Sequence, residues 1–206
     1  MLAQFSRLGF GAALLVACLA LGGCAIGRKA DYSHAGPITS LSSQDKVAVT
    51  VHDARPYVVN GQKNPTYVGV QRAMLGNPWN INTLSGQPLA HDLTLAVQEG
   101  LKNNAIAVVP VFVSFRESHS DVKAKLLATG ARRMLLLTLW DFYSDTYANT
   151  GFTFKAKLEV FDAKGALLAA SSTTSTPNGT VTNLQVATRQ YLSQLLNAPQ
   201  VLEAMK

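Results

Sequence analysis

The feature that most constrains the fold is a predominantly apolar run at residues 134–143, which reads MLLLTLWDFY. A run without alternation is typical of a strand that is covered on both faces. Strict alternation follows at residues 152–161, where apolar side chains share one face and Lys155, Lys157 and Glu159 share the other. Alternation indicates a strand with one solvent-exposed face and hence an antiparallel neighbour. We therefore predict that residues 134–143 form the central strand of a sheet.

Periodicity predicts the elements around this pair of strands. They are a strand at 46–53, a helix at 88–103, an apolar strand at 106–115, a short helix at 121–129 capped by Ser120, a hairpin strand at 166–176 and a final helix at 181–196. Pro110 makes the third of these an edge strand or splits it in two, because proline donates no backbone hydrogen bond. The predicted order, β-α-β-α-β-β-β-α, indicates a single α+β domain with a mixed, largely antiparallel sheet packed by two or three helices.

The segment at residues 54–84 is too long for an ordinary connection, which usually takes about 2–6 residues. Asn60 and Gly61 predict a β-turn, so part of the segment is expected to form an extra hairpin. The segment also contains aromatic and arginine residues of the kind that recognition surfaces favour: Arg55, Tyr57, Tyr67, Arg72 and Trp79. Two interpretations stay open, since these side chains either bind a partner or pack as a small satellite core.

The amino-terminal segment resembles a bacterial lipoprotein signal. Arg7 supplies a positive charge, residues 8–21 carry none, and the stretch ends in Leu-Gly-Gly-Cys at 21–24. The apolar run is shorter than the roughly 20 residues of a spanning helix. The tetrapeptide resembles the lipobox, in which the chain is cleaved between Gly23 and Cys24. The resemblance implies that Cys24 receives a diacylglycerol and an amide-linked acyl chain.

Processing of this kind would change what the chain contains. Cleavage would remove 23 of the 206 residues, including Cys18, and lipidation would consume Cys24. No thiol would remain for metal or redox chemistry, and no further cofactor is expected. The mature chain is predicted to be a lipidated tether at 24–45, which lacks periodicity, and a periplasmic domain at 46–206. By family analogy, Ala25 is not the aspartate that retains lipoproteins at the inner membrane, which implies the periplasmic face of the outer membrane.

Two His-Asp pairs are the candidates for catalysis, His52 with Asp53 and His91 with Asp92. Neighbouring residues on a strand point to opposite faces, so His52 and Asp53 are not expected to chelate one metal ion. Asp92 falls in the first turn of a predicted helix, where a carboxylate interacts favourably with the helix dipole without any catalytic role. An envelope hydrolase that uses these pairs is kept as an alternative function.

The charged residues give weaker signals. Asp53 and Arg55 at the end of the first strand either contact an anion or a partner, or form a local salt bridge or turn cap, which is the simpler interpretation. The formal net charge of +6 is dispersed along the chain and does not form a nucleic-acid footprint. Neither a nucleic-acid partner nor a metal ion is therefore expected.

Several patterns besides the lipobox resemble the uncharacterised YajG-type lipoproteins of Gram-negative bacteria. They are V-x-V-x-D-x-R at 49–55, the helix at 89–103 and the strand at 152–159. The element order is also similar to the small domain at the amino end of TolB-like proteins, which concerns the fold alone. The lipobox, the aromatic and arginine residues of the long segment and the absence of a catalytic motif together predict a membrane-anchored, non-enzymatic lipoprotein. We expect it to bind a protein or an envelope component through residues 54–84; a purely structural lipoprotein is a further alternative.

Overall fold

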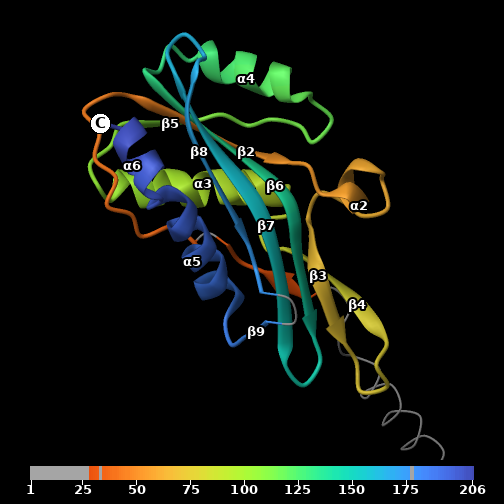
Figure 1. Ribbon diagram of the computed structural model, residues 1–206. Helices are drawn as coiled ribbons and strands as arrows, with labels where there is room; N and C mark the ends of the chain where they lie inside the picture. The colour runs from red at the N-terminus through yellow and green to blue at the C-terminus, as the bar shows by residue number, and fades with distance from the viewer. Residues whose placement is uncertain (1–27, 33, 177–178) are drawn as a thin grey trace, which may run out of the picture.

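A computed structural model describes residues 28–32, 34–176 and 179–206 (Figure 1). The strands are β1 (Lys29–Ala30), β2 (Val47–Asp53), β3 (Tyr67–Arg72), β4 (Pro78–Thr83), β5 (Val108–Pro110), β6 (Arg133–Thr146), β7 (Thr150–Asp162), β8 (Leu167–Thr174) and β9 (Thr180–Val181). The helices are α2 (Pro56–Val59), α3 (Leu89–Lys102), α4 (His119–Leu127), α5 (Leu184–Leu196) and α6 (Pro199–Ala204). The predicted signal peptide, Gly23 and Cys24 lie outside the described residues. Within those ranges, no helix combines the length and the apolar character needed to cross a bilayer.

Strand β6 is the centre of the sheet. One of its edges pairs in parallel with β2 along residues 133–139 and with β3 along residues 144–146. Its other edge pairs antiparallel with β7 over its whole length. Strand β5 flanks β2, β4 and then β1 flank β3, and both β8 and β9 pair with β7. The predicted central strand and the mixed sheet are thus confirmed, and the longest pairing, between β6 and β7, is antiparallel.

Helices α3, α5 and α6 pack on one face of the sheet, and α4 packs on the other (Figure 1). The alternation in β2 decides the placement of its side chains. Val47, Val49 and Val51 join the larger core with α3, while Ala48 joins the smaller core with Val122 of α4. The predicted helices at 88–103 and 181–196 are present as α3 and α5, and β5 lies at the sheet edge as Pro110 requires.

The described part of the predicted tether at 24–45 is not a free linker. Strand β1 pairs with β4, and Tyr32 and Leu41 are buried in the larger core. The side-chain amide of Asn197 donates to the carbonyl of Ile38 at 2.9 Å. An extended segment that is held by such contacts needs no periodicity, so its packing leaves little trace in the sequence. The folded unit therefore begins earlier than predicted.

The predicted β-turn at Asn60 and Gly61 does not join two strands. Pro56 begins α2, since its ring presets φ for a first helical turn, and Asn60 caps the end of that helix. The hairpin is formed instead by β3 and β4, which residues 73–77 connect, with Gly76 at a φ of +82°. The extra hairpin is thus present, but its turn lies later in the segment.

The start of α4 also differs from the prediction. Ser118, and not Ser120, is the N-cap: its Oγ accepts a hydrogen bond from the Asp121 backbone N–H at 3.2 Å. The carboxylate of Asp121 accepts in return from the Ser118 backbone N–H at 3.3 Å. This reciprocal capping box satisfies two backbone donors and outcompetes a cap at Ser120.

Strand β3 comes unusually close to β6 at Gly69. The φ of Gly69 is +149°, and a Cβ there would lie 2.2 Å from the backbone oxygen of Ser144. The Ser144 hydroxyl donates to the carbonyl of Val68 at 3.2 Å. Only glycine fits this approach, which attaches the β3–β4 hairpin to the second half of β6.

Candidate functional site

The β3–β4 hairpin and α2 extend the sheet beside the second half of β6 (Figure 1). Because β3 and β6 run in parallel, their carboxyl ends meet, and the turn at 73–77 lies beside the turn at 147–149. The hydroxyl of Tyr147 joins the two turns by donating to the carbonyl of Met74 at 3.2 Å. We call residues 73–79 and 147–149 together the hairpin end.

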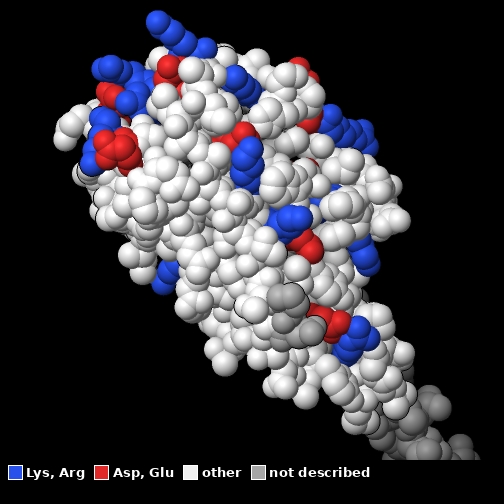
Figure 2. All heavy atoms as spheres, in the orientation of Figure 1, with Lys and Arg blue, Asp and Glu red and all other residues white. Residues whose placement is uncertain are grey.

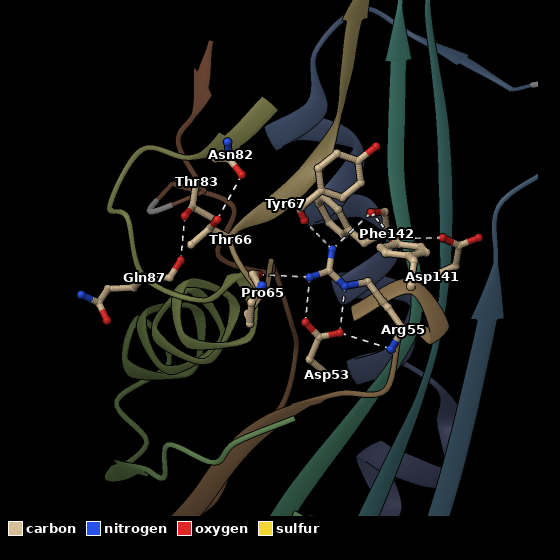
Figure 3. Close-up of polar contacts among 11 residues, drawn as sticks. Asp53, Arg55, Pro65, Thr66, Tyr67, Asn82, Thr83, Gln87, Asp141 and Phe142 are labelled. Atoms are coloured by element: carbon tan, nitrogen blue, oxygen red, sulfur yellow. Dashed lines mark hydrogen bonds and ion pairs between the residues drawn. The ribbon is translucent and has the colours of Figure 1, made fainter. Parts of the chain in front are cut away.

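Arg55 ties the base of this segment to the sheet (Figure 3). Its Nε and Nη2 donate to the two carboxylate oxygens of Asp53 at 2.8 and 2.7 Å. Its Nη1 donates to the carbonyls of Tyr67 and Phe142 at 2.6 and 3.5 Å, and Nη2 also donates to Pro65 at 3.2 Å. The five N–H donors of the guanidinium thus have five acceptors.

The Arg55 side chain is completely buried, and Asp53 is almost so. Burial by itself lowers the pKa of Arg55, but its hydrogen bonds and attraction to Asp53 outweigh that effect, and the net pKa is raised. A partner cannot contact a group without exposed surface. The prediction that Arg55 binds a partner is therefore wrong, and the local salt-bridge interpretation is confirmed.

Tyr57 and Tyr67 form most of the satellite core that the sequence left open. The Tyr57 hydroxyl donates to the Phe142 carbonyl at 2.9 Å, and its ring meets that of Tyr67 edge-on, with centroids 5.8 Å apart. Tyr67 is buried, and Lys63 lies over its ring with Nζ 4.5 Å from the centroid. Burial raises the pKa of Tyr57 to about 12 and raises that of Tyr67 as well. Both rings are accordingly neutral packing groups.

Arg72 lies at the surface but already has a partner. Its Nε and Nη2 donate to the two carboxylate oxygens of Asp145 at 2.7 and 2.6 Å, with the side chains 39% and 30% exposed. Tyr143 adds a hydrogen bond to Asp145 at 3.3 Å. Hydrogen bonds from Arg72 hold the pKa of Asp145 below its usual value. The pair links β3 to β6 and remains accessible from solvent.

Among the described residues, the two most exposed large apolar side chains lie at the hairpin end. Met74 is 89% exposed, Leu75 86%, Tyr147 58% and Trp79 42%. Of these residues, only Trp79 was predicted from the sequence to contact a partner. The signal for the others is the apolar pair Met74-Leu75 immediately before Gly76, because a turn ordinarily carries polar residues.

The first His-Asp pair does not form a catalytic unit. Both carboxylate oxygens of Asp53 are engaged by Arg55. His52 points to the opposite face of β2, and its Nε2 has no hydrogen-bond partner among the described residues. Burial lowers the pKa of His52 and outweighs the opposing attraction of Asp53.

The second pair is adjacent to a hydroxyl but in the wrong arrangement for hydrolysis. The Oγ of Ser85 donates to both carboxylate oxygens of Asp92 at 2.8 Å. The His91 ring stacks on Phe112 with centroids 4.1 Å apart, and its Nδ1 lies 3.7 Å from Asp92 Oδ1. A nucleophile needs contact with its base, whereas here the hydroxyl contacts the carboxylate. In the described ranges, no group of three or more His, Cys, Asp or Glu side chains is placed to hold a metal ion.

No family model and no curated protein matches the sequence. Among solved structures, a Xanthomonas campestris protein of the DUF330 family has 13% identity and a TM-score of 0.45, with 85% of this chain and 93% of that chain covered. The PelC dodecamer of Paraburkholderia phytofirmans has 12% identity and a TM-score of 0.46, with 83% and 95% covered. The Neisseria meningitidis lipoprotein GNA1162 has 12% identity and a TM-score of 0.29, with 71% and 94% covered. Likeness of this degree does not transfer a function to the chain.

Proposed function

We propose that this chain is a non-enzymatic lipoprotein, anchored through Cys24 at the periplasmic face of the outer membrane. Its hairpin end contacts a component of the cell envelope. Cys24 carries a diacylglycerol and an amide-linked acyl chain in this proposal, and no other cofactor takes part. The support for the anchor is the sequence of the first 24 residues, which combines one charge, a short apolar run and Leu-Gly-Gly-Cys.

The observation that carries the contact surface is the exposure of Met74 and Leu75 at the tip of an ordered hairpin. The Gly76 backbone N–H donates to the carbonyl of Ala73 at 2.8 Å, and Tyr147 holds the neighbouring turn against it. The tip is thus built without using these two apolar side chains for the fold. Exposed apolar groups on a rigid support are typical of an interaction surface.

The geometry favours this function over the hydrolase alternative. Asp53 belongs to the Arg55 salt bridge, and Ser85 contacts Asp92 instead of His91. Neither His-Asp pair is arranged as a base that activates a nucleophile or a water molecule.

Two measurements on the full chain test the two parts of the proposal. Cys24→Ser should abolish incorporation of labelled palmitate and move the protein out of the membrane fraction. The lipid anchor would be wrong if wild type incorporated no palmitate and Cys24→Ser stayed in the membrane fraction. Crosslinking of whole envelopes followed by pull-down tests the contact surface.

For the crosslinking test, Met74→Ser with Leu75→Ser should remove the contacts that wild type forms. The matched control is Val59→Ser, which replaces an exposed apolar residue of α2 in the same segment and should leave those contacts unchanged. An identical contact pattern in all three proteins would contradict the assignment to the hairpin end.

A further inference from the structure

The start of the described chain lies beside the hairpin. Strand β1 pairs in parallel with β4, with Lys29 opposite Asn82 and Ala30 opposite Thr83. The guanidinium of Arg28 donates to the side-chain oxygen of Gln71 on β3. Since β4 runs from the hairpin turn towards Thr83, a parallel β1 enters from the side of the turn.

The length of chain before β1 limits where an anchor at Cys24 can be. Three residues lie between Cys24 and Arg28, so the four steps from one to the other span at most about 14 Å. Arg28 is level with Ile81, which is four strand residues from Asn77, or about 13 Å at the usual rise. An acylated Cys24 can therefore hold the hairpin turn close to the plane of the lipid headgroups.

The composition of the hairpin end suits that position. Met74 and Leu75 are apolar and almost fully exposed, and Tyr147 and Trp79 are aromatic residues of the kind that concentrate at membrane interfaces. On the face seen in Figure 2, charged side chains are numerous over the broad end of the molecule and sparse towards the narrow end. The two turns at 73–77 and 147–149 themselves contain no charged residue.

Two basic residues lie at the start of the described chain. Arg28 directly precedes β1 and Lys29 is its first residue, and both are exposed. The charge of Arg72 is offset by its carboxylate partner Asp145. Two exposed cations close to the proposed anchor are attracted to anionic headgroups.

We propose that the partner of the hairpin end is the lipid surface itself: Met74 and Leu75 insert between headgroups, and Trp79 lies at the interface. This inference rests on the proposed function and specifies its envelope component as lipid. The acyl chains hold the protein on the membrane, and the tip sets its orientation. The carboxyl end of β6 then lies near the bilayer, and its amino end lies farther from it. Insertion to the depth of about 5–10 Å that interfacial segments reach would be sufficient.

The two tryptophans provide a depth measurement with an internal control. Trp79 lies at the hairpin end, whereas Trp140 lies six residues before Thr146 on β6, about 20 Å away along the strand. The acylated full chain is reconstituted into vesicles of phosphatidylethanolamine and phosphatidylglycerol whose acyl chains are brominated. Fluorescence is read from Trp140→Phe, in which Trp79 reports, and from Trp79→Phe, in which Trp140 reports.

Insertion predicts that Trp79 loses most of its fluorescence and that its emission shifts to shorter wavelength, while Trp140 is little quenched. Met74→Ser with Leu75→Ser, made in the Trp140→Phe background, should restore the emission of Trp79 although the protein still sediments with the vesicles. Equal or absent quenching of the two tryptophans in a sedimenting protein would overturn the lipid contact. So would a protein crosslink at the tip without quenching. Failure of the anchor has a different readout, because the wild-type protein would then carry no acyl chains and would not sediment with the vesicles.

Discussion

Arg55 and Arg72 belong to the same 31-residue segment, and each forms a two-point contact with an aspartate carboxylate. Their environments are opposite. Arg55 is completely enclosed and donates to three backbone carbonyls in addition to Asp53. Arg72 and Asp145 remain partly exposed to solvent.

The comparison teaches that the residue type does not decide the role of a side chain in such a segment. A buried guanidinium is stable only with all its donors satisfied, so Arg55 orders the backbone around it and is unavailable to a partner. An exposed pair costs less to form and contributes less. The apolar turn offers surface for contact, because the Met74 and Leu75 side chains are almost fully exposed and neither takes part in the arginine–aspartate pairs.

The largest expected effect comes from breaking the buried pair. Arg55→Met should lower the free energy of unfolding by about 3–5 kcal/mol, because Asp53 is left as a buried charge without a partner. Chemical denaturation measures the loss. The double variant Asp53→Asn with Arg55→Met should lose less than the single variant. A double variant as unstable as the sum of the two singles would contradict this account of the pair.

A smaller effect tests the burial of His52 through the pH dependence of the unfolding free energy. Burial lowers the pKa of His52 below 6.5, so the unfolded chain binds a proton that the folded chain does not, and stability falls as the pH drops below that value. The slope from this one group is at most about 1.4 kcal/mol per pH unit. His52→Gln should flatten the difference in unfolding free energy between neutral and mildly acidic pH. An unchanged slope would mean that His52 titrates normally.

The exposed pair of Arg72 and Asp145 should contribute still less to the free energy of unfolding. A double-mutant cycle of Arg72→Gln and Asp145→Asn is expected to give a much smaller coupling than the buried pair, because solvent screens both groups. The coupling should shrink in high salt. A larger coupling that does not change with salt would contradict the difference drawn between this exposed pair and the buried pair of Arg55 and Asp53.

The smallest effect on stability is expected at the hairpin end. Met74→Ser with Leu75→Ser should change the unfolding free energy by no more than about 0.5 kcal/mol, since neither side chain is buried. Thermal or chemical unfolding of the full chain measures it. A substantial loss would show that these residues support the fold and are not reserved for contact.

The elements with strong periodicity were predictable. Residues 134–143 and 152–161 have the patterns of a doubly covered strand and of a one-faced strand, and the structure pairs them as β6 and β7. The salt bridge between Asp53 and Arg55 was recognised as one of two interpretations, but its burial was not. Burial depends on Pro65, Tyr67 and Phe142, whose carbonyls only the tertiary fold brings together.

Other features leave weak local signals. The segment before residue 46 packs as an extended chain, held by contacts such as that of Asn197, which lies far along the sequence. The turn of the extra hairpin was placed at Asn60-Gly61, because this dipeptide is a strong turn signal; the structure uses it to end α2. The contact surface at Met74 and Leu75 was not predicted, because recognition residues were expected to be aromatic or arginine and these two are neither.

The most direct test compares two introduced thiols in the same segment of the acylated, vesicle-bound protein. After processing at Cys24, no other cysteine of the mature chain is free, so each introduced thiol is unique. Leu75→Cys places it at the hairpin end, and Val59→Cys places it on α2, where the native side chain is half exposed. A membrane-impermeant maleimide should label Val59→Cys on vesicles and leave Leu75→Cys unlabelled, while both react in detergent-free solution once the anchor is removed. Equal labelling of the two thiols on vesicles would contradict the assignment of the hairpin end as the contact surface.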